Sequence, residues 1–315
     1  MASSEQIAKE YYEKGNSLLQ ANDIESAIDN YNMAKSIYEE LQEHHQYIMT
    51  LRGLAISYGI MSFDSKMLYK CLDALNYIDK YKIKGAKHYF YTIICNRYMV
   101  LGDYDSAVNY GKMALQDLED HGTEFDNQPK PYLVACLNLA YAYLHINRYN
   151  EAELYLKRAM EIAQKNDLHN HDLSISVLNA NLHHKIGDNQ YVYDNIDQLV
   201  STIQSYGINI NDYLADLKLL VETFCSMKEF SRAEAVAANL KSYGTIAGNY
   251  YLILEATKLY MMVYKASGEE EKYHQVCVDY AENSISLRNT EANKHLLEMD
   301  TAIALSIADT PIELL

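Results

Sequence analysis

The sequence predicts an all-α solenoid, and three observations lead to this prediction. The 315 residues include only three prolines and 12 glycines, the residues that usually end helices and form turns. Pairs of mostly small residues stand seven positions apart, which places both members on one helix face. These pairs recur about every 40 residues along the chain, a period typical of stacked helical repeats.

The three clearest copies of the repeat align without a gap. Their small-residue pairs are Ala27 with Ala34, Ala107 with Ala114, and Ala152 with Ala159. Weaker copies begin at Met67, Val192, Ala233 and Tyr273. The longest spacing lies between Ala107 and Ala152, and it contains Pro129 and Pro131, so we expect a loop there.

Each copy predicts a second helix, and a matching first helix precedes it. The first helices carry a mostly small residue twelve positions before the anchor, at Gly15, Ala55, Cys95, Ala140, Ala180, Val221 and Met261. Small residues let two helix axes approach closely. We therefore expect seven helix pairs within residues 1–283, and a further helix within residues 284–315 that caps the last repeat or connects to another domain.

Composition and charge exclude several classes of protein. A net charge of −16 disfavours nucleic-acid binding, and no apolar run is long enough to cross a membrane. The cysteines Cys71, Cys95, Cys136, Cys225 and Cys277 are widely spaced and odd in number, which is typical of free thiols in the cytoplasm.

No catalytic or cofactor motif is recognisable. Walker-type, dinucleotide-binding and nucleophile-elbow motifs do not occur, so we expect no enzyme activity and no cofactor. Histidines gather at His169, His171, His183 and His184, near Asp172. Because the two pairs are separated by about three helical turns, or ~16 Å, one metal ion cannot bridge them.

The pairs of small residues and the Gly102-Asp103-Tyr104 turn resemble the tetratricopeptide repeat, from about residue 8 to residue 285. That resemblance implies a right-handed superhelical solenoid of helix pairs. The unit is longer than the 34 residues usual in the family. Longer units look like those of bacterial regulators, namely Rap- and PlcR-type peptide receptors and repeat arrays fused to cyclic-di-GMP-synthesising (GGDEF) domains.

In such a solenoid the first helices line a concave groove, and we expect polar residues there to contact a ligand. The candidates are Arg52, Asn96, Asn138, Tyr141, Asn181, Lys218, Glu222 and Lys258. Asparagine pairs with both groups of a peptide backbone, and the cationic side chains suit a carboxylate.

The sequence therefore predicts a cytoplasmic, non-catalytic module that binds a peptide or protein segment, with a regulatory or sensory role. Two alternatives stay open. The chain could be the sensory region of a larger bacterial signalling enzyme, such as a GGDEF diguanylate cyclase, or a passive scaffold for protein assembly. The helix expected after residue 284 could also form a homodimer.

Overall fold

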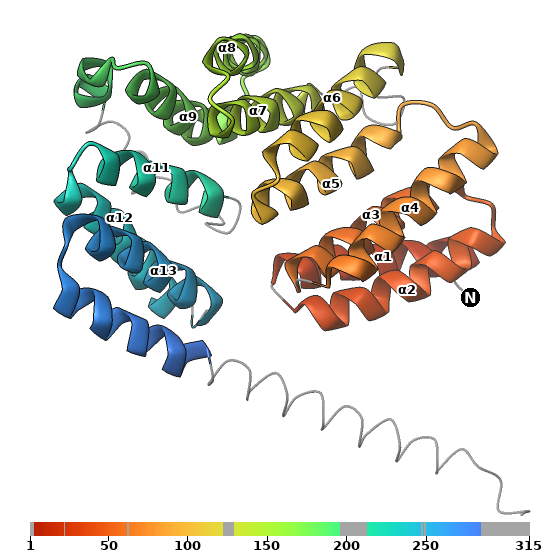
Figure 1. Ribbon diagram of the computed structural model, residues 1–315. Coiled ribbons are helices and arrows are strands. Elements are labelled where there is room, and N and C mark those ends of the chain that lie inside the picture. The colour runs from red at the N-terminus through yellow and green to blue at the C-terminus, as the bar shows by residue number, and fades with distance from the viewer. Residues whose placement is uncertain are drawn as a thin grey trace, which may run out of the picture. The chain divides into compact units, whose positions relative to one another are not determined.

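The computed structural model describes residues 3–21, 23–61, 63–121, 129–195, 213–246, 248 and 250–284. Regular structure in these residues is entirely helical (Figure 1). The chain forms two compact units, residues 1–175 and residues 176–315, which are described separately here. No described helix has the length and apolar character needed to span a membrane.

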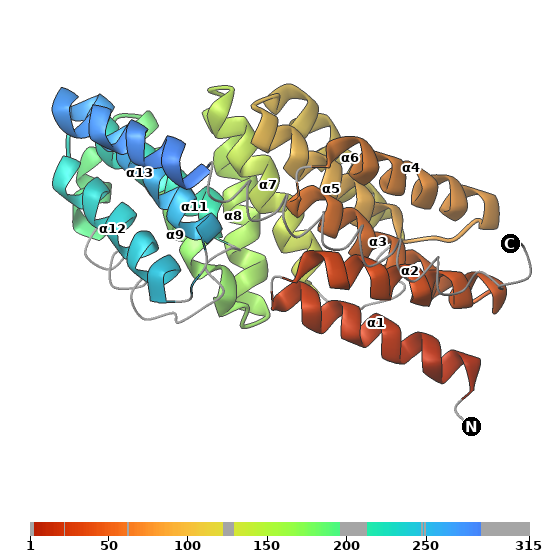
Figure 2. The same cartoon turned by 90° about the horizontal axis from the view of Figure 1, so that it is seen from below.

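Unit 1 consists of four helix pairs. They are α1 (Ser4–Gln20) with α2 (Ile24–Glu40), α3 (His44–Ile60) with α4 (Asp64–Tyr81), α5 (Lys87–Leu101) with α6 (Tyr104–His121), and α7 (Lys130–His145) with α8 (Tyr149–Lys165). The two helices of each pair pack against each other (Figures 1 and 2). We call α1, α3, α5 and α7 first helices, and consecutive first helices of this unit also contact each other.

Unit 2 continues the same pattern. A single 3-10 turn (His169–His171) leads into α9 (Asp172–Lys185), the fifth first helix, which starts in unit 1 and extends into unit 2. Residues 189–195 are helical after it. The sixth pair is α11 (Leu214–Ser226) with α12 (Phe230–Ile246). The seventh is α13 (Tyr250–Ser267) with a helical segment at residues 270–284.

Local chemistry explains where several helices begin and end. The side chains of Ser3 and Asp23 accept hydrogen bonds from the backbone N–H groups at the starts of α1 and α2. Asp103 does the same for Ser106 of α6, at 3.1 Å. Gly102 ends α5 with φ = +78°, a left-handed conformation that costs glycine little.

The predicted repeat positions form the core. Six anchors are at most 1% exposed: Ala27, Met67, Ala107, Ala152, Val192 and Ala233. The seventh, Tyr273, is half-buried. The helix pairs thus stand where the spacing predicts them, and the all-α solenoid fold is confirmed.

The closest packing in unit 1 is around Tyr31 of α2. Its ring lies between Gly15 of α1 and Gly53 of α3, where added Cβ atoms would come within 2.8 and 2.7 Å of ring atoms. Its hydroxyl donates a hydrogen bond of 2.7 Å to the side-chain oxygen of Asn16. The pKa of Tyr31 is raised to about 12, chiefly by burial and also by the neighbouring Tyr12, while Arg52 acts in the opposite direction. A side chain of a second helix thereby reaches between two first helices.

Parts of three sequence predictions lie outside the described residues. These parts are residues 122–128 of the expected loop, the second helix of the fifth pair after residue 195, and nearly all of the helix expected within residues 284–315.

Candidate functional site

Asn96 of α5 and Asn138 of α7 form a direct link between consecutive first helices. The Asn138 amide nitrogen donates a hydrogen bond of 2.7 Å to the Asn96 side-chain oxygen. Asn96 is exposed and Asn138 is half-buried, so the pair lies at the surface of unit 1. The structure brings these two predicted residues together.

Aromatic rings lie near the C-terminal end of α7. His145 stacks on Tyr104 of α6, with centroids 4.2 Å apart and planes 7° apart. The predicted residue Tyr141 is 4.5 Å from His145 and 6.3 Å from Tyr104. The sequence analysis singled out Tyr141 but not Tyr104, because Tyr104 follows the turn at the start of a second helix. The three rings form a partly exposed aromatic surface.

Arg52 of α3 is the remaining candidate in unit 1. Its guanidinium carbon lies 5.1 Å from the centroid of the Tyr89 ring of α5. This distance is typical of a cation–π contact. The Arg52 side chain is half-buried and therefore partly accessible to solvent.

In unit 2 the predicted residue Asn181 is not on an open surface. It is 3% exposed, and its amide donates a hydrogen bond of 2.8 Å to the Thr223 hydroxyl of α11. The next turn of α9 places His184 2.8 Å from the Ser226 hydroxyl and 2.7 Å from the Asn189 side-chain oxygen. The structure therefore places Asn181 in the packing between two first helices.

These polar links share one sequence separation. Asn96 with Asn138, Asn181 with Thr223, and His184 with Ser226 are each 42 residues apart. In each link, a residue on one first helix meets a residue on the first helix of the next repeat. Only the link between Asn96 and Asn138 joins two of the predicted site residues.

The other predicted residues of unit 2 form ion pairs along their own helices. Lys218 and Glu222 of α11 are 4.0 Å apart, and Glu255 and Lys258 of α13 are 2.6 Å apart. Burial raises the pKa of Glu222, while Lys218 and Lys185 lower it. Burial lowers the pKa of Lys258, but its hydrogen bond to Glu255 leaves the pKa above its usual value.

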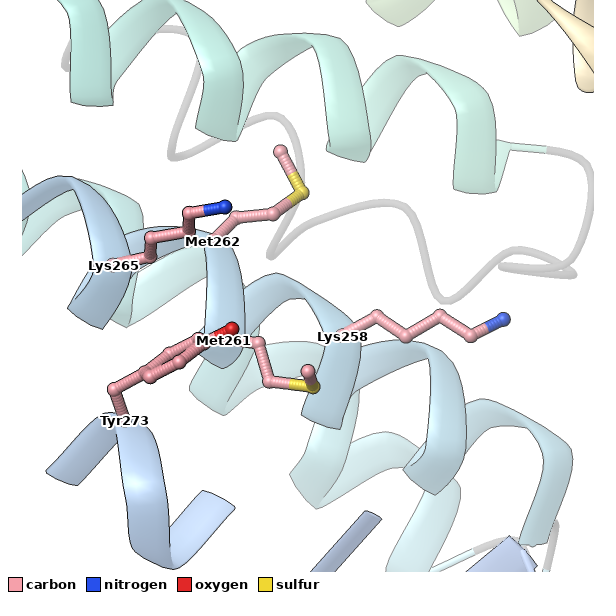
Figure 3. A pocket seen from close by; sticks show the side chains of 5 residues that line it. All are labelled: Lys258, Met261, Met262, Lys265 and Tyr273. Carbon is pink, nitrogen blue, oxygen red and sulfur yellow. The ribbon is translucent and has the colours of Figure 1, made fainter. Parts of the chain in front are cut away.

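Lys258 also lines a shallow cavity of about 220 Å³ (Figure 3). The other lining residues are Met261, Met262 and Lys265 of α13, and Tyr273 of the following helical segment. Its walls are largely apolar, with one ammonium group on Lys258 and another on Lys265. Met261 and Tyr273 occupy the repeat positions that are fully buried in earlier repeats, so the seventh repeat is less completely covered among the described residues.

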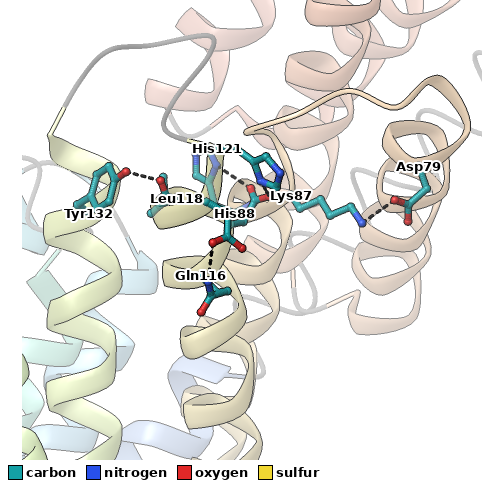
Figure 4. A network of polar contacts seen from close by, with 9 residues as sticks. Asp79, Lys87, His88, Gln116, Leu118, His121 and Tyr132 are labelled. Carbon is teal, nitrogen blue, oxygen red and sulfur yellow. Dashed lines mark hydrogen bonds and ion pairs between the residues drawn. The ribbon is translucent and has the colours of Figure 1, made fainter.

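A buried polar network joins α5 and α6 (Figure 4). The backbone N–H of His88 donates to the Asp117 carboxylate at 2.9 Å, and His121 Nδ1 is 3.3 Å from the same carboxylate. Burial alone raises the pKa of Asp117, but the bonds from His88 and the nearby charges of His88 and His121 bring the pKa below its ordinary value. Lys87 adds an ion pair of 2.6 Å to Asp79 of α4. These contacts connect helices within unit 1.

The cysteine thiols of the described residues are buried or half-buried. Burial raises the pKa of Cys71 and Cys95 to about 12, and that of Cys136 and Cys225 to about 11, so these thiols are poor nucleophiles. Within the described ranges, no three histidine, cysteine, aspartate or glutamate side chains gather as ligands for one metal ion.

Comparison with known proteins identifies the repeat type. A family model described as tetratricopeptide repeat matches residues 133–166, which cover most of α7 and all of α8. The apo form of RapI has a similar structure, with a TM-score of 0.54 and 17% identity, over 86% of this chain and 87% of that chain. No curated protein matches the sequence.

A second solved structure contains nearly identical tetratricopeptide-like repeats of a putative kinesin light chain from Podospora anserina. It matches with a TM-score of 0.49 and 16% identity, over 64% of this chain and 96% of that chain. The family match covers one repeat, and the similarity to RapI extends the helical-repeat fold over most of the chain.

Proposed function

We propose that this chain is a non-catalytic module that binds a peptide or an extended protein segment along the first helices of unit 1. The repeat type and the RapI-like fold support a protein- or peptide-binding module. We place the binding site at α5 and α7 because Asn96 and Asn138 pair at the surface between these helices.

The amide pair retains the groups that a peptide backbone needs. A primary amide has two donor hydrogens and an acceptor oxygen. The bond between the two side chains uses one hydrogen of Asn138 and one lone pair of Asn96. The Asn96 nitrogen and the Asn138 oxygen are then available for a backbone C=O and N–H of the ligand, whatever its side chains are.

The rings of Tyr104, Tyr141 and His145 supply the apolar part of the site. The rings are already packed against one another. Binding of a ligand side chain to them therefore immobilises few additional rotatable bonds, which keeps the entropy cost of binding low. Aromatic residues of this kind contribute much of the binding energy in protein interfaces.

The construction of the repeats supports a regulatory role. Each pair contacts mainly its neighbours, so the angle between successive pairs depends on few contacts. A ligand that contacts both α5 and α7 favours one angle between their helix pairs. A second protein that binds this arrangement of the repeats better than others would then bind more strongly when the ligand is present. The free cysteines agree with a reducing, cytoplasmic compartment.

The test measures binding of short random peptides by equilibrium dialysis with mass spectrometry. We expect the double variant Asn96→Ala with Asn138→Ala to weaken retention roughly tenfold, because two net hydrogen bonds are lost. Asn109→Ala, which removes an exposed amide from α6, is the matched control and should bind as the wild type does.

The same measurement separates a binding groove from a passive scaffold. A scaffold that captures partners through second helices or a terminal surface retains its partners in the double variant. Equal retention by wild type, double variant and control would therefore contradict the proposed site.

A further inference from the structure

We propose that Arg52 binds a carboxylate group of the ligand, as the single fixed positive charge of this site. The inference rests on the proposed function and specifies which chemical group the first helices of unit 1 recognise.

Arg52 differs from the other described arginines in having no acidic partner. The ion pairs of the others are Arg97 with Asp64, Arg148 with Glu151, Arg158 with Glu119, and Arg232 with Glu229. Within the described part of the chain, Arg52 forms no ion pair, although the whole sequence carries a net charge of −16. An unpaired guanidinium in so acidic a protein is available to an external anion.

The surroundings of Arg52 hold the guanidinium in place without using its charge. The guanidinium carbon lies over the Tyr89 ring, 5.1 Å from the ring centroid. A guanidinium that contacts an aromatic face in this way keeps its planar set of N–H groups for hydrogen bonds. These N–H groups form the fork that matches the two oxygens of a carboxylate.

A second donor stands on the neighbouring first helix. The side-chain oxygen of Asn16 accepts the Tyr31 hydroxyl at 2.7 Å, which leaves the Asn16 amide nitrogen as a donor. Arg52 directly precedes Gly53 on α3, and Gly53 packs against the same Tyr31 ring. The Arg52 guanidinium on α3 and the Asn16 amide nitrogen on α1 therefore lie on neighbouring first helices, close to the same tyrosine.

The chemistry favours a carboxylate over a phosphate. One guanidinium balances the single charge of a carboxylate, whereas a phosphate group carries about −1.5 to −2 charges and stays partly uncompensated. The other cationic candidates are less suitable, because Lys218 and Lys258 already have the partners Glu222 and Glu255.

The experiment uses three pools of random peptides with acetylated N-termini. One pool has free C-terminal carboxylates and lacks aspartate and glutamate, the second has amidated C-termini and contains both acids, and the third is amidated and lacks both. We expect the wild type to retain one of the first two pools more strongly than the third. The preferred pool tells whether the carboxylate is terminal or belongs to a side chain.

Arg52→Gln should reduce the retention of the preferred pool roughly tenfold or more, because a charge-assisted hydrogen bond is lost. Arg148→Gln is the matched control. Its guanidinium carbon also lies over a tyrosine, 5.0 Å from the Tyr143 ring, but it is paired with Glu151, so its removal should leave the preference unchanged. Should Arg52→Gln unfold, Arg52→Lys keeps the charge without the fork and is expected to retain part of the preference.

The outcomes separate this inference from the proposed function. Equal retention of all three pools, or a preference that survives in Arg52→Gln, overturns the role of Arg52 while peptide binding stands. Retention of none of the pools overturns both. Comparing the three pools on the wild type shows, without any variant, whether the protein prefers peptides that carry a carboxylate.

Discussion

Replacing Gly53 by alanine should destabilise unit 1, although alanine favours helices more than glycine does. An alanine Cβ at position 53 would lie 2.7 Å from Cζ and 2.8 Å from Cε1 of the Tyr31 ring. The ring cannot move away freely, because Gly15 bounds its other side at a similar distance. Either the ring or one of the helices α1 and α3 must shift.

The magnitude follows from two opposing terms. Overpacking a close-packed core costs about 1–3 kcal/mol. The better helix propensity of alanine offsets about 1 kcal/mol of that cost. Gly59→Ala, in the same helix, isolates the first term, because its Cβ would be 3.4 Å from the flexible Met67 side chain. We expect Gly59→Ala to be neutral or slightly stabilising, and Gly53→Ala to be less stable than it by about 1–3 kcal/mol.

The assay is urea unfolding followed by pulsed alkylation of Cys71, which lies in unit 1 and is fully buried. Labelling of this thiol reports the opening of unit 1 separately from unit 2. Tyr31→Leu, which removes the ring, should abolish most of the difference between the two alanine variants. Equal stability of Gly53→Ala and Gly59→Ala in the wild-type background would refute the packing argument.

Two further predictions concern polar contacts. Asn181→Ala should lower the free energy of unfolding by about 1–3 kcal/mol, because it removes a buried hydrogen bond and leaves the Thr223 hydroxyl with only its bond to the Leu219 carbonyl. Asn138→Ala should change the free energy of unfolding by less than about 0.5 kcal/mol. Urea titrations of both variants measure this, and equal costs would contradict the burial of Asn181. The pKa of Asp117 is lower in the folded state than in the unfolded state. The ionised carboxylate therefore contributes its full stabilisation of the fold above the ordinary aspartate pKa near 4. This contribution is lost as the pH falls through the pKa of the folded state. Asp117→Asn should therefore have a lower free energy of unfolding than wild type at neutral pH, and the difference should shrink in acid. Urea unfolding at a series of pH values measures this. A difference that stays constant from neutral pH to pH ~3 would argue against the network around His88.

Much of the fold could be predicted from the sequence, because the repeat places small residues where helices must meet. The anchors from Ala27 to Ala233 are buried as the spacing requires, and the helix pairs follow from them. The pairing of Asn96 with Asn138 was less accessible to sequence reasoning. Both residues were candidates, but the 42-residue separation of their contact emerges only when the first helices pack.

The predicted face of a helix was the weaker part of the reasoning. Alignment assigned Asn181 to the same open face as Asn138, yet Asn181 is buried against Thr223. A small rotation of a helix about its axis moves a residue from a groove to an interface, and the period does not specify that rotation. Nor does the spacing reveal that Glu222 and Glu255 neutralise the lysines one turn away, which leaves Arg52 as the unpaired cation among the candidates.

The amide pair of α5 and α7 has a further property, which concerns the direction of a bound chain. If both amides turn over together, the Asn96 nitrogen donates to the Asn138 oxygen, and the bond between them is restored with its polarity reversed. The pair therefore accepts a backbone that runs from N to C or from C to N equally well. Any preference for one direction must come from a group without this symmetry, and a fixed guanidinium such as that of Arg52 is one.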